Sequence, residues 1–82
     1  MSSETSTRLY PEPVRQGSAT ATAVYATLLT AERPLAYADL TAEIGASKRA
    51  IKQAVYDLRD AGVITSRPDP TAPSRRLHEL AD

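Results

Sequence analysis

The sequence predicts a small, mainly α-helical domain made of three helices and closed by a β-hairpin. Apolar residues recur every three or four positions from residue 18 to residue 61, which is the period of an amphipathic helix. Gly45 and Gly62 each follow the last apolar position of a helical stretch, where a left-handed C-terminal cap belongs. After Gly62 the helical period stops, and Val63–Ile64–Thr65 is typical of the start of a strand.

Length and composition limit the classes of protein to which the chain can belong. The 82 residues suffice for one domain, and the lack of Cys excludes disulfides, thiolate metal sites and cysteine nucleophiles. No apolar run approaches the ~20 residues that span a bilayer, and MSSETSTR lacks the apolar stretch of a signal peptide. We therefore expect a soluble cytoplasmic protein.

The first part of the chain is expected to be a flexible arm over residues 1–16, in front of a domain over 17–82. This arm is rich in Ser, Thr and Glu, and Pro11 and Pro13 bracket Glu12. Each Pro removes a backbone donor and restricts the residue before it, so no helix is expected here. The arm also contains apolar residues that can pack on the domain or on a partner: Leu9, Tyr10 and Val14.

The first two helices are predicted over residues 18–31 and 37–44, on either side of a short strand at 35–36. Ser18 can cap the first helix, and Asp39 in the first turn of the second stabilises that helix through its dipole. Pro34 ends the first helical segment. The expected inward faces comprise Ala21, Val24, Tyr25 and Leu28 in the first helix and Tyr37, Leu40 and Ile44 in the second.

The third helix, residues 47–61 with Ser47 as its cap, is predicted to have an apolar face and a basic face. At about 100° per residue, its apolar residues fall within one arc. They are Ile51, Ala54, Val55, Leu58 and Ala61. The other side comprises Lys48, Arg49, Lys52, Tyr56 and Arg59, with Gln53 and Asp60 at its edge.

The segment after the third helix is predicted to be a hairpin with turn residues at Pro68–Pro73. The periodicity of 74–80 fits either a strand or a helix, and a strand is favoured because the first strand needs a partner. The net charge is zero, but residues 45–76 carry seven basic and three acidic side chains. Positive charge is therefore concentrated on the third helix and the hairpin.

Two helices joined by a Gly-containing turn, the second of them basic and amphipathic, form a helix-turn-helix pattern, and the hairpin makes it a winged helix-turn-helix. The run PLAYADLTAEIGASKRAIKQAVYDLRDAGVI resembles the core of winged helix-turn-helix regulators of the MarR family. The resemblance covers about residues 18–80. It implies a non-enzymatic, nucleoid-associated protein that binds double-stranded DNA and regulates transcription.

In such families the third helix enters the major groove and the wing, here residues 67–76, lies on the backbone. The candidate nucleic-acid-binding residues are Ser47, Lys48, Arg49, Lys52, Gln53, Tyr56, Arg59, Arg67, Arg75 and Arg76. The cations of Lys48, Lys52 and Arg59 suit phosphates. Arg49 and Gln53 can pair bidentately with guanine and adenine.

The chain departs from full-length MarR-type proteins in its length, and it also has a second family resemblance. MarR-type proteins dimerise through long flanking helices for which this chain has no residues. A homodimer would therefore use the first helix, the N-terminal arm or the C-terminal strand, and a protein partner would use the first helix or the arm. The spacing of the basic residues and Tyr56, with Thr71 and Pro73 in the wing, is also similar to Z-alpha domains, which bind left-handed nucleic acid. Lys52 stands where those domains have Asn, and the wing has no Trp.

Several other interpretations of the same residues stay open. The basic face also fits a solvated surface, and winged helices also serve as protein-docking modules. In a docking module, the arm and the Ala/Thr face of the first helix would form the contact. His78, the only histidine, is expected to be structural, and no spacing of Asp69, Glu79 and Asp82 suggests zinc. We expect no catalytic residue, metal or cofactor.

Overall fold

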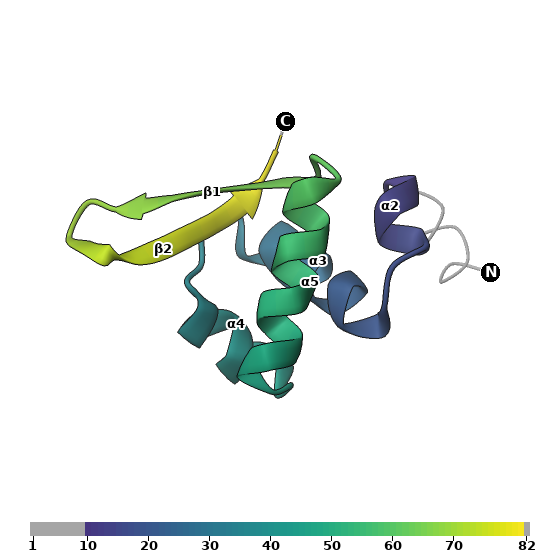
Figure 1. Cartoon of the computed structure of the whole chain (residues 1–82), viewed down its shortest axis with the longest axis horizontal. Helices are drawn as coiled ribbons and strands as arrows, with labels where there is room; N and C mark the ends of the chain where they lie inside the picture. Colours follow the sequence, from purple (N-terminus) through teal and green to yellow (C-terminus); the bar gives the residue numbers. More distant parts are fainter. Residues whose placement is uncertain (1–9, 82) are drawn as a thin grey trace.

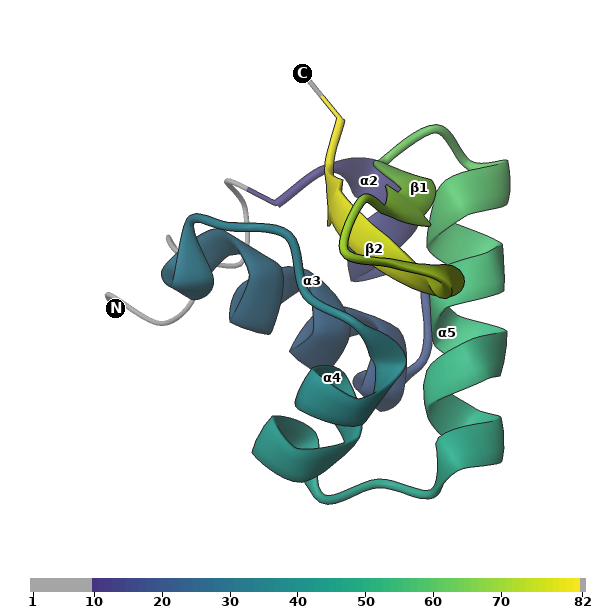
Figure 2. The same cartoon turned by 90° about the vertical axis from the view of Figure 1, so that its left-hand side faces the viewer.

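The computed structural model describes residues 10–81 and has the expected mainly helical fold with a C-terminal antiparallel hairpin. The helices of the described part are α2 (Glu12–Arg15), α3 (Ala19–Ala31), α4 (Tyr37–Ile44) and α5 (Lys48–Asp60). The hairpin consists of β1 (Ile64–Asp69) and β2 (Ala72–Leu80). Figures 1 and 2 show α3 and α5 side by side, with α4 against one end and the hairpin extending sideways from the other.

The helix boundaries agree with the prediction because the caps are local. Ser18 Oγ accepts a hydrogen bond from Ala21 N, and Ser47 Oγ accepts one from Ala50 N, each at 3.1 Å. Gly45 ends α4 at φ 78°, a left-handed conformation that is easy only for a residue without Cβ. The first long helix ends before Pro34, at Glu32, which itself adopts the left-handed conformation with φ 55°.

The prediction that residues 1–16 contain no helix is wrong for α2. Pro11 is the N-terminal cap of this short helix and Pro13 lies in its first turn, where the backbone N–H groups have no partner within the helix. The two prolines therefore fit the start of a helix rather than preventing it. Val14 is fully buried in the core, so this part of the predicted arm packs on the domain. Residues 1–9, including Leu9, lie outside the described residues.

The core lies between α3, α4, α5 and the hairpin, and it is built from aliphatic side chains. The expected inward residues Ala21, Val24 and Leu28 are buried, as is Leu40 of α4. All the predicted apolar positions of α5 are buried except Ala61, which is exposed because it follows the last helical residue as a C-terminal cap. Tyr25, Tyr37 and Ile44 are partly buried and pack against the cluster.

The hairpin has a tighter turn than the sequence predicts. The turn is confined to Pro70 and Thr71, while Pro68 and Pro73 lie in the strands, where Pro is tolerated at an edge. The register shifts between Pro68 and Asp69, so β2 bulges near the tip. Asp69 Oδ1 accepts hydrogen bonds from the backbone N (2.9 Å) and the hydroxyl (2.8 Å) of Thr71. These bonds, with Arg75 nearby, hold the pKa of the Asp69 carboxyl below its usual value.

The short strand expected at 35–36 is a single bridge. Leu35 and His78 exchange backbone hydrogen bonds, with Leu35 N donating to His78 O at 2.9 Å and His78 N to Leu35 O at 2.8 Å. This bridge places the start of α4 directly beside β2. It therefore fixes the hairpin relative to the helices and joins the wing to the helix-turn-helix.

Candidate nucleic-acid interface

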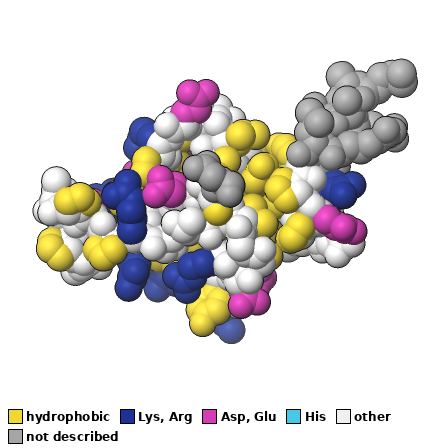
Figure 3. Space-filling model, turned by 90° about the horizontal axis from the view of Figure 1, so that it is seen from above, with side chains coloured by type: hydrophobic (Ala, Val, Ile, Leu, Met, Phe, Trp, Pro, Cys, Tyr) yellow, Lys and Arg dark blue, Asp and Glu magenta, His cyan; other side chains and the backbone are white. Residues whose placement is uncertain are grey.

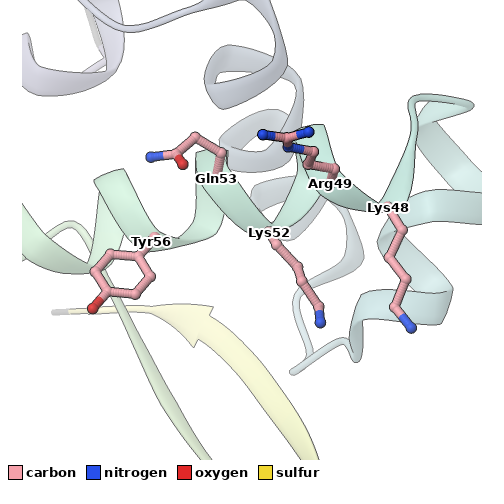
Figure 4. Close-up of a pocket in the computed structure, with 5 residues that line it drawn as sticks. All are labelled: Lys48, Arg49, Lys52, Gln53 and Tyr56. Carbon is pink, nitrogen blue, oxygen red and sulfur yellow. The ribbon is translucent and has the colours of Figure 1, made fainter.

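The exposed face of α5 gathers five of the predicted site residues along one shallow hollow. The hollow has a volume of about 470 Å³ and is lined by Lys48, Arg49, Lys52, Gln53 and Tyr56. In Figure 4, Lys48, Lys52 and Tyr56 point to one side of the helix, while Arg49 and Gln53 point to the other. The two lysines therefore present positive charge along one edge, and Arg49 and Gln53 present planar groups with several hydrogen-bond donors along the other.

Several of these side chains already have partners on α5 itself. Gln53 Nε2 donates to Asp57 Oδ1 at 3.0 Å, and the Arg59 guanidinium lies 5.1 Å from the Tyr56 ring centroid. Tyr56 is 63% exposed, so it stands out from the helix as the largest exposed apolar surface on this face. Ser47 is exposed, but its hydroxyl caps the helix, so its first role in the structure is to start α5.

The three predicted wing cations differ in what they contact. Arg67 Nε lies 2.9 Å from Glu79 Oε2, an ion pair across the hairpin. Arg75 Nη2 lies 3.4 Å from Asp39 Oδ2 of α4, and its Nε lies 4.0 Å from Asp69 Oδ2. Arg76 is exposed and forms no ion pair within residues 10–81. Figure 3 shows the Lys and Arg side chains of this region gathered behind the apolar tip of the wing, with acidic side chains among them.

A second concave region joins the wing to α5. This cleft has a volume of about 730 Å³, and its cationic lining comes from Lys48, Lys52, Arg75 and Arg76. Its apolar floor comes from α4 and the residue before it, chiefly Ala36, Tyr37 and Ala38. The structure therefore brings two lysines of α5 and two arginines of the wing to one cleft, and it leaves Arg67 outside that lining.

The alternation of side chains between the two faces of the hairpin explains why Arg67 lies outside the cleft that Arg75 and Arg76 line. Successive residues of a strand point to opposite faces, so Arg76 shares the face of the buried His78. Arg67 pairs in register with Leu77 and contacts Glu79 on the other face. The bulge near the tip then allows Arg75 to reach α4. This register could not be predicted, because the position of the bulge does not follow from the order of prolines.

His78 lies in the joint between the hairpin and α4 and is fully buried. Its Nδ1 lies 2.7 Å from Ser66 Oγ, and its ring centroid lies 4.3 Å from that of Tyr37. Burial lowers the pKa of His78 to about 4, with further contributions from the charges of Arg59 and Arg76. The imidazole is therefore neutral near pH 7, as expected of a structural histidine.

Tyr37 and the carboxylate of Asp39 are not among the predicted site residues. The sequence predicts that Tyr37 faces the core, yet it is half-buried, lines the cleft and lies 5.7 Å from Lys52 Nζ. Asp39 is expected only to stabilise α4. It does so by accepting a hydrogen bond from Ala36 N at 3.0 Å, and it also holds Arg75. No local pattern signals the contacts with Lys52 and Arg75, because each joins residues far apart in the sequence.

Two further features concern metals and membranes. Across residues 10–81, the structure brings together no group of three His, Cys, Asp or Glu side chains that could hold a metal ion. None of the helices in this same part of the chain combines the length and the apolar character needed to cross a bilayer.

Comparison with known proteins supports the fold. No family model and no curated protein sequence matches the chain. The PcaV transcriptional regulator from Streptomyces coelicolor, solved with its natural ligand, superposes with a TM-score of 0.76 at 23% identity over 98% of this chain and 57% of that chain. A cysteine-to-serine mutant of ZitR from Lactococcus lactis gives 0.75 at 19% identity over 90% and 49%. The adhesin competence repressor AdcR of Streptococcus pyogenes gives 0.68 at 15% identity over 99% and 57%.

These likenesses confirm that the chain has the winged helix-turn-helix fold of MarR-type regulators. At identities between 15 and 23%, they establish the fold alone. The chain spans about half the length of the solved chains that it matches.

Proposed function

We propose that this chain is a double-stranded DNA-binding domain of a transcriptional regulator. The observation that carries the proposal is the shared hollow along α5, in which five exposed polar or aromatic side chains line one face of a single helix. An α-helix fits the major groove of B-DNA, and the second helix of a helix-turn-helix is the one that enters it. In this fold that helix is α5.

The side chains of α5 divide into two chemical roles in this proposal. Lys48 and Lys52, on one edge of the hollow, bind phosphates. Arg59, whose guanidinium lies 5.1 Å from the Tyr56 ring centroid, adds a third cation on α5. Arg49 and Gln53, on the other edge, present multiple donors in a plane and read base edges in the groove. Tyr56 packs beside the backbone, and Ser47 begins the helix at the point where it approaches the DNA.

The wing supplies the second contact with the phosphate backbone. Arg75 and Arg76 line the same cleft as Lys48 and Lys52, so a single strand of phosphates can contact both α5 and the wing. Arg67 joins them only if its ion pair with Glu79 opens. We place the protein in the cytoplasm, associated with the nucleoid, because that is where such a regulator meets its DNA.

A second copy of the chain or another protein is proposed to cover α3. This helix carries no charged residue over its whole length, and Leu29 on its surface is 46% exposed. An uncharged helix surface that exposes a large aliphatic side chain is a candidate for contact with another protein surface. The same observation favours the alternative function, a protein-docking module that uses α3 together with Tyr10, whose ring packs 5.0 Å from that of Tyr25.

Fluorescence anisotropy with a labelled random duplex, measured across a salt series, separates the two functions. A DNA-binding domain shows log affinity falling linearly with log salt, because each neutralised phosphate releases counterions. The K48Q/K52Q double variant should reduce the slope by about 2. The matched control R15Q/R33Q removes the same charge from exposed positions outside the interface and should leave the slope near that of the wild type. Absence of binding at low salt would favour the docking module.

A further inference from the structure

The strongest unexplained feature of the interface is a chain of contacts that links α5 to both strands of the wing. Ser66 of β1 lies 2.7 Å from His78 Nδ1, and His78 of β2 packs on the Tyr37 ring at 4.3 Å between centroids. Lys52 Nζ of α5 lies 5.7 Å from the centroid of that same ring. Tyr37 therefore contacts the wing through His78 and contacts α5 through Lys52.

We propose that Tyr37 is a positioning residue of the nucleic-acid interface, whose ring, seated on His78, holds the Lys52 ammonium in the cleft beside the wing arginines. This inference rests on the proposed DNA-binding function and adds a residue that is not itself expected to touch a base. Tyr37, at the first position of α4, packs against the core on one side and lines the cleft on the other.

The first support is the rigidity of the platform beneath Tyr37. His78 is fully buried and is tied to Leu35 by two backbone hydrogen bonds, just before α4 begins. The imidazole and phenol rings meet at an interplanar angle of 57°, a tilted arrangement that aromatic pairs favour. The ring of Tyr37 is therefore fixed on one side and leaves the cleft side free for a cation.

The second support is the chemistry of lysine. A lysine side chain has many rotamers, and ordering it on binding opposes affinity. A cation within about 6 Å of a ring centroid is attracted to the ring face, and Lys52 Nζ meets this condition. An ammonium has three donors, so the contact with the ring leaves N–H groups available to phosphate oxygens.

The third support is the position of Lys52 relative to the wing. Tyr37, Lys52 and Arg76 all line one cleft. If the ring were absent, Lys52 would be free to extend into solvent away from Arg76. An exposed cation–π contact changes affinity by about two- to fivefold, which sets the size of the expected effect.

A double-mutant cycle on duplex affinity tests the proposal. Tyr37→Met removes the ring at similar volume, and Tyr37→Phe keeps it. We expect Y37F to bind like the wild type and Y37M to lose about two- to fivefold in affinity. In the K52Q background, Y37M should lose nothing further. An equal loss with and without Lys52 would overturn the proposal, because it would mean that the ring only supports the fold.

A measurement without DNA keeps this inference distinct from the proposed function. The ring current of Tyr37 should shift the Lys52 side-chain methylene protons upfield in the NMR spectrum of the wild type and of Y37F. The shift should vanish in Y37M and persist in the matched control Tyr25→Met, which removes a partly buried tyrosine elsewhere. An unshifted Lys52 in the folded wild type overturns the positioning role even if Y37M fails to fold. If the Lys52 methylene protons are shifted upfield but the protein binds no duplex, the proposed function is wrong. The role of Tyr37 in DNA binding is then wrong as well.

Discussion

Arg67 and Glu79 face each other diagonally across the wing, with Arg67 Nε 2.9 Å from Glu79 Oε2. Arg67, one of the three wing arginines predicted to contact nucleic acid, is therefore held by a carboxylate of its own hairpin, as Arg75 also is by Asp69 at 4.0 Å. Both side chains of the Arg67–Glu79 pair are partly exposed, at 47% and 38%, so the pair is solvated and stabilises the fold only weakly. Its larger effect is on the charge that the wing presents.

Replacing Glu79 with Gln should therefore strengthen binding to a duplex. The substitution frees Arg67 and removes a negative charge near the phosphates, and the salt slope should steepen by up to about 1. Fluorescence anisotropy at several salt concentrations measures both effects. Glu43→Gln, on the exposed surface of α4, removes the same charge elsewhere and is the matched control. Equal effects of the two substitutions would contradict a role for Arg67.

His78 should make the stability of the fold depend on pH between about 4 and 6.5. Its pKa is lowered to about 4 in the folded protein and is near 6.5 when unfolded, so the unfolded chain binds more protons in this window. The contribution is fully present above pH 6.5 and is lost as the pH falls. By pH 5 the loss should reach about 2 kcal/mol. Asp69 does not contribute to this loss, because its lowered pKa lies below the usual value of 3.8.

Urea unfolding at pH 7 and pH 5 measures this effect. The His78→Phe variant keeps an aromatic ring against Tyr37 and has nothing to titrate at this position. Its stability should change by about 2 kcal/mol less than that of the wild type between the two pH values. The same pH dependence in both proteins would show that His78 does not cause it.

Two substitutions at Ser47 separate its role as a cap from its role at the interface. Ser47→Ala should lower the free energy of unfolding by about 1 kcal/mol, because Ala50 N loses its acceptor. Ser47→Asp should keep the cap and the stability, and yet weaken DNA binding by placing a negative charge at the start of α5. Thermal unfolding and anisotropy on both variants provide the test. Undiminished binding by the Asp variant would remove Ser47 from the interface.

Arg49 and Lys48 should differ in what they contribute to recognition. Arg49→Ala should relax the preference for one base pair, with a loss of about 1–3 kcal/mol on the preferred sequence. Lys48→Ala should weaken binding to all sequences similarly and reduce the salt slope by about 1. Selection from a randomised duplex library, followed by affinity measurements, distinguishes these outcomes. A uniform loss for both variants would contradict base reading by Arg49.

The features that are predictable from the sequence are those that depend on neighbouring residues. Ser18, Ser47 and Gly45 set the ends of their helices through local hydrogen bonds and backbone conformation, and the structure confirms them. The period of α5 likewise separates its buried from its exposed face. Because the helical period is a local signal, it also predicts that the candidate residues of α5 lie together on its exposed face.

The features that sequence reasoning misses depend on contacts between distant segments. Pro11 and Pro13 predict the absence of a helix, whereas at a first turn they support one, and the burial of Val14 against the core stabilises α2. The pairing of Arg75 with Asp39 depends on a bulge whose position the sequence does not mark. The tilted contact of Tyr37 with His78 joins α4 to β2, beside the bridge between Leu35 and His78.

The surface that we propose for DNA binding consists of α5 and the wing. Chemical-shift mapping by NMR, with a short duplex titrated into the labelled protein, tests it most directly. We expect the largest shifts on residues 47–59 and 67–76, with α3 nearly unchanged. Shifts concentrated on α3 and Tyr10, or no shifts at all at low salt, would contradict it.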